Sequence, residues 1–146
     1  EICNIGITYE IFSEYELAIA FYKKAIDLNT KNIRAMNNLA RVYIDVAKDY
    51  DTAIKYLDYI IKISPNDAEA YNTYGNLHCI KNEYKMAETY LKKSIFLDDK
   101  FFKNYYDIAN VYIQTGDMQK AEENLQKCIE LNPNFETAKE LMQKIK

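Results

Sequence analysis

Glycine and proline are scarce in this chain, whose 146 residues contain three glycines and two prolines. Average sequences use several times more of both. An all-β sandwich or barrel needs turn residues between many short strands, so the scarcity excludes those folds. It also excludes collagen-like chains and flexible linkers. With 49% hydrophobic and 28% charged residues, the chain has enough apolar surface to fold, and we expect an all-α protein with short connections.

Other absences narrow the classes of function. The net charge of −3 leaves no surplus of basic residues, so we expect neither nucleic-acid binding nor membrane binding. No apolar stretch reaches the length of a membrane span. The three cysteines, Cys3, Cys79 and Cys128, are odd in number and widely spaced. That pattern is neither a disulfide framework nor a zinc motif, and it favours a cytoplasmic or other reducing intracellular compartment.

A repeat of about 34 residues runs through the sequence. Four alanines are spaced 35, 34 and 34 residues apart: Ala18, Ala53, Ala87 and Ala121. Upstream of each alanine lies a small residue that follows an apolar one, and these are Gly6, Ala40, Gly75 and Ala109. Apolar residues step by three and four within each unit, which predicts two helices of about 14 residues in every repeat.

Helix ends are also marked in the sequence. Ser13 to Glu16 has the form of a capping box that opens a second helix. Asp49, Asn82 and Asp117 are candidate N-caps for the other second helices. These positions predict a turn of two or three residues between the paired helices.

The spacing resembles the tetratricopeptide repeat, a 34-residue pattern of an aromatic, Leu-Gly, Tyr, Ala, an aromatic or Leu, Ala and Pro. In the fourth unit the matching residues are Tyr105, Ile108-Ala109, Tyr112, Met118, Ala121, Leu125, Cys128 and Pro133. The resemblance covers essentially the whole chain. It implies an all-α fold, a right-handed α-solenoid of antiparallel helix pairs with about nine helices.

The register divides the chain into one array of four repeats at about 1–32, 33–67, 68–101 and 102–135. The first repeat starts late, which predicts that the chain is a fragment of a larger protein. The second carries one extra residue in its turn near Val46-Ala47-Lys48. Residues 136–146 match the first helix of a further repeat, and we expect them to form a C-terminal capping helix.

In tetratricopeptide-repeat proteins the first helix of each pair lines a concave groove that binds extended peptides or partner segments. The resemblance implies such a groove here, with these candidate binding residues: Asn4, Arg34, Asn37, Asn38, Arg41, Asn72, Asn76, Lys103, Tyr106 and Asn110. An asparagine amide can donate to and accept from a peptide backbone. The same face carries Asp45, Glu69, Cys79, Ile80, Asp107 and Gln114. Because the face carries both basic and acidic residues, we expect no strong preference for a partner of either charge.

Candidate catalytic groups have simpler structural interpretations. His78 takes a position that other repeats fill with tyrosine, so we expect a partly buried, hydrogen-bonded histidine. Cys128 occupies a small core position. The sequence contains no P-loop, GxGxxG, GxSxG or HExxH motif. We therefore expect no enzyme activity, no metal and no cofactor.

A carboxylate clamp for the C-terminal tails of heat-shock chaperones is not expected. Such clamps present Lys and Asn, then Asn, then Lys and Arg on successive first helices. The corresponding positions here read Asn37, Arg41, Thr73, Lys103 and Asp107, and a carboxylate at Asp107 would repel the tail.

The sequence therefore predicts a protein–protein interaction module, a scaffold or adaptor. Two alternatives stay open. The chain could be the docking region of an enzyme whose catalytic domain lies outside these residues. It could also self-associate through its first repeat, where Ile2 and Ile5 would be exposed.

Overall fold

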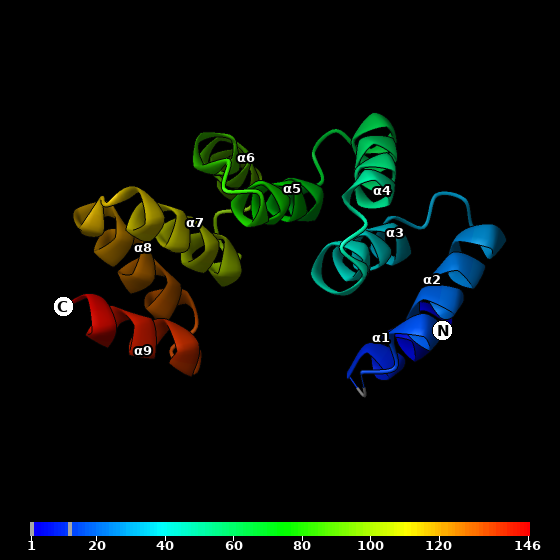
Figure 1. Cartoon of the computed structure of the whole chain (residues 1–146), viewed down its shortest axis with the longest axis horizontal. Helices are drawn as coiled ribbons and strands as arrows, with labels where there is room; N and C mark the ends of the chain where they lie inside the picture. Colours follow the sequence, from blue (N-terminus) through cyan, green and yellow to red (C-terminus); the bar gives the residue numbers. More distant parts are fainter. Residues whose placement is uncertain (1, 12) are drawn as a thin grey trace. The chain divides into compact units, whose positions relative to one another are not determined.

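The computed structural model describes residues 2–11 and 13–146, without the side chain of Ile11. Every regular element in those residues is helical. The elements are α1 (Ile2–Ile11), α2 (Tyr15–Leu28), α3 (Ile33–Val42), the π-helix η1 (Tyr43–Ala47), α4 (Tyr50–Ile63), α5 (Ala68–Ile80), α6 (Tyr84–Leu97), α7 (Phe102–Thr115), α8 (Met118–Leu131) and α9 (Glu136–Ile145). In Figure 1 the pairs α1–α2, α3–α4 and α7–α8 run antiparallel and side by side. The predicted all-α class is confirmed.

The chain forms two compact units, unit 1 at residues 1–73 and unit 2 at residues 74–146. In unit 1, α1 packs on α2 and α3 on α4, while α3 also contacts α1 and α2. In unit 2, α7 packs against α6 and α8, and α9 packs against α8. Contacts between successive hairpins stabilise each unit, because one hairpin cannot bury its apolar face alone.

Small residues allow paired helices to approach closely. A Cβ atom added at Gly6 would lie 2.7 Å from the ring of Tyr22, and one added at Gly75 would lie 2.6 Å from Cγ of Leu91. Both distances are too short for a methyl group. These two glycines therefore lie at helix–helix contacts.

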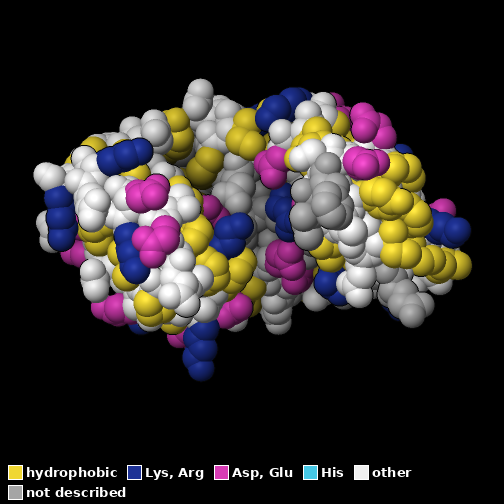
Figure 2. All heavy atoms as spheres, turned by 90° about the horizontal axis from the view of Figure 1, so that it is seen from below, with side chains coloured by type: hydrophobic (Ala, Val, Ile, Leu, Met, Phe, Trp, Pro, Cys, Tyr) yellow, Lys and Arg dark blue, Asp and Glu magenta, His cyan; other side chains and the backbone are white. Residues whose placement is uncertain are grey.

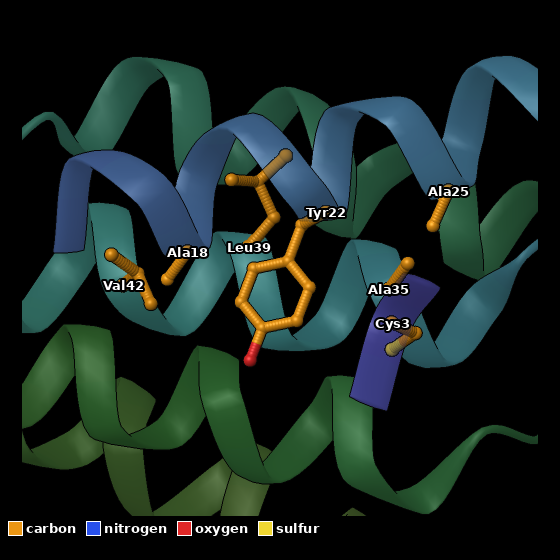
Figure 3. Close-up of a cluster of buried hydrophobic side chains, with 7 residues drawn as sticks. All are labelled: Cys3, Ala18, Tyr22, Ala25, Ala35, Leu39 and Val42. Carbon is orange, nitrogen blue, oxygen red and sulfur yellow. The ribbon is translucent and has the colours of Figure 1, made fainter. Parts of the chain in front are cut away.

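Large side chains fill the space that the small residues leave. In unit 1 the ring of Tyr22 extends from α2 toward α3 and lies beside Leu39 (Figure 3). Its hydroxyl donates a hydrogen bond of 2.6 Å to Oε1 of Glu10. Burial and this bond raise the pKa of Tyr22. The tyrosine thus fills the core with its ring and satisfies its polar end at the edge of the core.

The turn between paired helices places one residue of each repeat in the left-handed region. These residues are Ser13, Lys48, Asn82 and Gly116, with φ of 61°, 55°, 60° and 87°. They are 34 or 35 residues apart. The dihedral angles therefore repeat with the same period as the alanines, although only one of the four residues is a glycine.

The N-cap predictions have two outcomes. Asp49 and Asp117 are confirmed, because their side chains accept hydrogen bonds from the backbone N–H groups of Thr52 and Lys120. The capping roles given to Ser13 and Asn82 are wrong. Both are the left-handed turn residue that immediately precedes the N-cap. The N-cap residues themselves are Glu14 and Glu83, and neither makes a side-chain cap bond.

The π-helix η1 takes up the extra residue of the second repeat. Its wider turn keeps the chain helical up to Ala47, and left-handed Lys48 then ends it. Two second helices end shortly before a proline, since α4 ends at Ile63 before Pro65 and α8 ends at Leu131 before Pro133.

Replacing Gly75 with alanine would push a methyl group against Leu91. We expect Gly75→Ala to lower the free energy of unfolding by about 1–3 kcal/mol. In a Leu91→Ala background the same change should cost less, because the shorter side chain leaves room. Urea unfolding of the four proteins measures the coupling. Additive effects would contradict the steric explanation.

Two turn variants should change stability in opposite directions. Gly116→Ala should lower the free energy of unfolding by about 1 kcal/mol, because a Cβ atom disfavours the left-handed region. No clash contributes, since an added Cβ there would meet no atom within 4 Å. Lys48→Gly should raise the free energy of unfolding by about 0.5 kcal/mol, because glycine relieves the strain of the left-handed backbone and this gain exceeds the added entropy of the unfolded chain. Thermal unfolding tests both, and shifts of equal sign would refute the assignment.

Candidate partner-binding surface

The ten predicted binding residues differ widely in exposure. Asn4, Arg34 and Lys103 are exposed, whereas Arg41, Asn76, Tyr106 and Asn110 are half-buried and Asn37, Asn38 and Asn72 are buried. The buried asparagines cannot present their amides to a partner without rearrangement. The exposed and half-buried residues are therefore the ones available on the surface.

The buried asparagines of α3 link neighbouring segments of unit 1. Asn37 donates from Nδ2 to Oδ2 of Asp67 at 2.8 Å. Asn38 donates from Nδ2 to the Sγ atom of Cys3 at 3.8 Å, a weak hydrogen bond between α3 and α1. Asn38 thus links successive repeats, and Asn37 links α3 to the connection that precedes α5.

Arg41 is held between two carboxylates of unit 1. Its Nη2 atom lies 3.1 Å from Oε2 of Glu10, and its Nη1 atom lies 3.8 Å from Oε1 of Glu69. Glu10 also accepts the hydroxyl of Tyr22. The guanidinium charge is therefore balanced within the protein, which weakens any attraction for an acidic partner.

In unit 2, hydrogen bonds link α5 and α7. Asn76 donates from Nδ2 to Oδ2 of Asp107 at 3.3 Å. One turn further along α7, Asn110 donates from Nδ2 to the carbonyl of Tyr106 at 3.1 Å. The Tyr106 ring meets the Phe135 ring edge-on, with centroids 5.2 Å apart. These contacts hold the α5 and α7 side chains in fixed positions.

An open pocket lies beside these bonds in unit 2. It has a volume of about 300 Å³ and is lined by Cys79, Ile80, Tyr84, Asn110, Val111 and Gln114. Four of the lining residues, Cys79, Ile80, Asn110 and Gln114, were placed on the groove face by the repeat register. Burial, and then the carboxylate of Asp107, raise the pKa of Cys79 to about 11, so its thiol is uncharged at neutral pH.

A smaller pocket lies in unit 1. It has a volume of about 120 Å³ and is lined by Glu10, Tyr15, Arg41, Val42, Asp45 and Val46. The Glu10–Arg41 ion pair is part of its wall. Charged groups therefore dominate this pocket, in contrast to the uncharged lining in unit 2.

Glu10 and Asp67, the partners of Arg41 and Asn37, were not among the predicted groove residues. A signal for them exists in the spacing, because Glu10–Arg41 and Asn76–Asp107 are both 31 residues apart and Asn37–Asp67 is 30 apart. In the first two pairs, an interval of one repeat less about one helical turn joins residues on adjacent first helices. Asp67 lies just before α5. Complementary side chains at that interval could have been paired in advance.

No arrangement for metal or acid–base chemistry stands out in the described residues. They contain no group of three or more His, Cys, Asp or Glu side chains that could hold a metal ion. His78 stacks on Tyr90 with centroids 5.2 Å apart, and its Nδ1 atom is 3.6 Å from Oε2 of Glu83. That separation exceeds a hydrogen bond, so the expected bond is not formed at this nitrogen. His78 thus acts as an aromatic packing residue.

The surface carries charges of both signs. On the face drawn in Figure 2, basic and acidic side chains are interspersed with hydrophobic ones. Ile5, one of the residues expected to be exposed in the first repeat, is 42% exposed, whereas Ile2 packs against the core of unit 1. None of the helices in the described ranges has the length and apolar character needed to cross a membrane.

Comparison with known proteins gives relatives with related sequences. The chain is 26% identical over 140 residues to the general transcriptional corepressor ssn6 of Schizosaccharomyces pombe, an alignment that covers 94% of this chain and 13% of the relative. It is 29% identical over 93 residues to serine/threonine-protein phosphatase 5 of Rattus norvegicus, covering 64% of this chain and 19% of that protein. The chain thus spans a small part of these relatives.

Solved structures share the fold. MamA has a TM-score of 0.72 at 26% identity, over 97% of this chain and 82% of that chain. PilF of Pseudomonas aeruginosa has a TM-score of 0.85 at 19% identity, over 99% and 65% of the two chains. The second likeness concerns the fold alone.

Family models describe most of the sequence. One tetratricopeptide-repeat model matches residues 2–32, 68–101 and 102–135, and a second matches residues 21–55. These matches agree with the helix pairs, the buried small residues and the repeated turn geometry. The chain belongs to the tetratricopeptide-repeat family.

Proposed function

We propose that this chain is a scaffold or adaptor module that binds an extended segment of a protein partner along its first helices. The observation that carries the proposal is the open pocket of unit 2, because it gathers residues that the repeat register places on one face. Peptide recognition needs a depression with apolar walls and a few polar groups that fix the backbone. Ile80 and Val111 supply apolar atoms, while Asn110 and Gln114 supply amides.

The names of the relatives support protein partners in general. One is a transcriptional corepressor, and another, 22% identical over 91% of this chain, is anaphase-promoting complex subunit 3 of Schizosaccharomyces pombe. Asn4, Asn76 and Asn110 remain at the surface, and asparagine amides can pair with a peptide backbone whatever its side chains. Arg41 is already paired with Glu10 and Glu69, which argues against selection of an acidic partner by charge alone.

Peptides selected from a random phage-displayed library against the whole chain test this function. Amide chemical-shift changes on binding should concentrate in α1, α3, α5 and α7, because these helices carry the proposed face. The second helices α2, α4, α6 and α8 are the internal control. Failure to enrich any peptide, or shifts concentrated in the second helices, would refute the proposal.

A second candidate is a docking region of an enzyme, with the catalytic domain outside these residues. The similarity to serine/threonine-protein phosphatase 5 favours it, since the aligned residues make up only 19% of that enzyme. The same surface would then bind a substrate or a regulator. Sequencing the complete reading frame decides the matter, because a catalytic domain must be encoded beside the repeats, and a frame without one removes this candidate.

A further inference from the structure

One pocket of unit 1, bordered by the Glu10–Arg41 ion pair, and the open pocket of unit 2 occupy the same place in the repeat. Five lining residues of the unit 1 pocket correspond to five of the unit 2 pocket at a constant interval of 69 residues, two repeat lengths including the inserted residue. The pairs are Glu10 and Cys79, Tyr15 and Tyr84, Arg41 and Asn110, Val42 and Val111, and Asp45 and Gln114. Each pocket lies between successive first helices, at the start of a second helix. The fold therefore builds one kind of depression twice.

The chemistry of the two pockets differs at three of these five pairs. Where unit 1 has Glu10, Arg41 and Asp45, unit 2 has uncharged Cys79, Asn110 and Gln114. The Glu10 and Arg41 side chains of unit 1 meet at 3.1 Å, and the pocket they border measures about 120 Å³ against about 300 Å³ in unit 2. The smaller pocket is thus the one whose wall contains an ion pair.

An uncharged pocket selects its occupant by the cost of removing charge from water. A Lys, Arg, Asp or Glu side chain entering the unit 2 pocket would lose hydration without finding an opposite charge in the lining. An acidic side chain would in addition meet the nearby carboxylate of Asp107, whose field already acts on Cys79. An apolar side chain gains from contact with Ile80, Tyr84 and Val111.

We propose that the unit 2 pocket receives one apolar side chain, aliphatic or aromatic, of an extended partner segment, and that the Glu10–Arg41 ion pair closes the equivalent pocket of unit 1 to such a side chain. The proposal rests on the function proposed above and adds the chemistry of the anchor. Asn110 and Gln114, four residues apart on α7, lie on one side of the helix and border the pocket. Their amides can hold the backbone on either side of the inserted residue.

Giving the unit 2 pocket the chemistry of the unit 1 pocket tests the proposal. The double variant Cys79→Glu/Asn110→Arg introduces the unit 1 ion pair into unit 2 and should close the pocket there. Peptides enriched on the wild-type chain should share an apolar residue, and their affinity, measured by calorimetry, should fall about tenfold or more on the double variant. Replacing the shared apolar residue with aspartate should weaken binding to the wild-type chain by a similar factor, because its carboxylate would lose hydration beside Asp107.

Matched variants separate closure of the pocket from damage to the fold. Phe96→Glu adds a single carboxylate at an 83% exposed side chain of the second helix α6, away from the proposed face, and should leave the affinity of the selected peptides within about twofold. Ile80→Glu adds a single carboxylate at a side chain that is 42% exposed. This variant should retain the fold and still lower the affinity, so it decides the question if the double variant does not fold.

The possible outcomes distinguish the two proposals. If peptides bind and shift the first-helix amides, but neither Cys79→Glu/Asn110→Arg nor Ile80→Glu lowers the affinity, the pocket proposal is overturned and the proposed function stands. A shared basic or acidic residue at the anchor position would overturn the pocket proposal in the same way. If no peptide is enriched, both proposals are overturned.

The Cys79 thiol gives an independent readout of occupancy. Because burial and the Asp107 carboxylate raise its pKa to about 11, N-ethylmaleimide should alkylate it more slowly at pH 8 than an ordinary exposed thiol. A bound peptide should slow the reaction further, and mass spectrometry locates the adduct, with Cys79→Ser as the control. Unchanged alkylation in the peptide complex would overturn insertion at this pocket.

Discussion

The close approach of paired helices at their small residues is the constraint on which the rest of the structure depends. Gly6 leaves room for the Tyr22 ring, and Gly75 leaves room for Leu91. Because a large residue on the second helix enters the space beside a small residue on the first, each hairpin has one preferred register. That register fixes which residues of the first helix turn toward the neighbouring first helix. The positions of the pockets and of the linking hydrogen bonds follow from this single packing condition.

The polar residues between first helices serve two purposes that periodicity alone does not separate. Some connect repeats, as Asn76 connects α5 to α7 through Asp107 in unit 2, and others line a pocket. In unit 1 the Glu10–Arg41 pair serves both purposes, since it links α1 to α3 and borders the pocket. An exposed ion pair adds little to stability. Its effect on binding is greater, because it determines which side chains can enter.

Much of the fold could be predicted from the spacing of small and apolar residues, while details of the turns and of burial could not. Asp49 and Asp117 were recognisable as caps because aspartate favours that position. Ser13 and Asn82 were predicted to be N-caps, but each is the turn residue just before the N-cap. Serine and asparagine are compatible with both positions, so the residue type does not separate them. The burial of Asn37 depends on Asp67, which lies in a connection between helices. Helical periodicity assigns a face to Asn37 but not the segment that covers it.

Each pocket is assembled from two halves that different repeats contribute. The first helix of one repeat supplies Cys79 and Ile80, and the first helix of the next supplies Asn110 and Gln114. Duplicating or deleting one whole repeat would therefore join halves that had not met before. A change in repeat number alone would create a pocket of new composition at the junction, with no substitution in either half. Recognition by such a chain can evolve by recombination of its units as readily as by mutation within them.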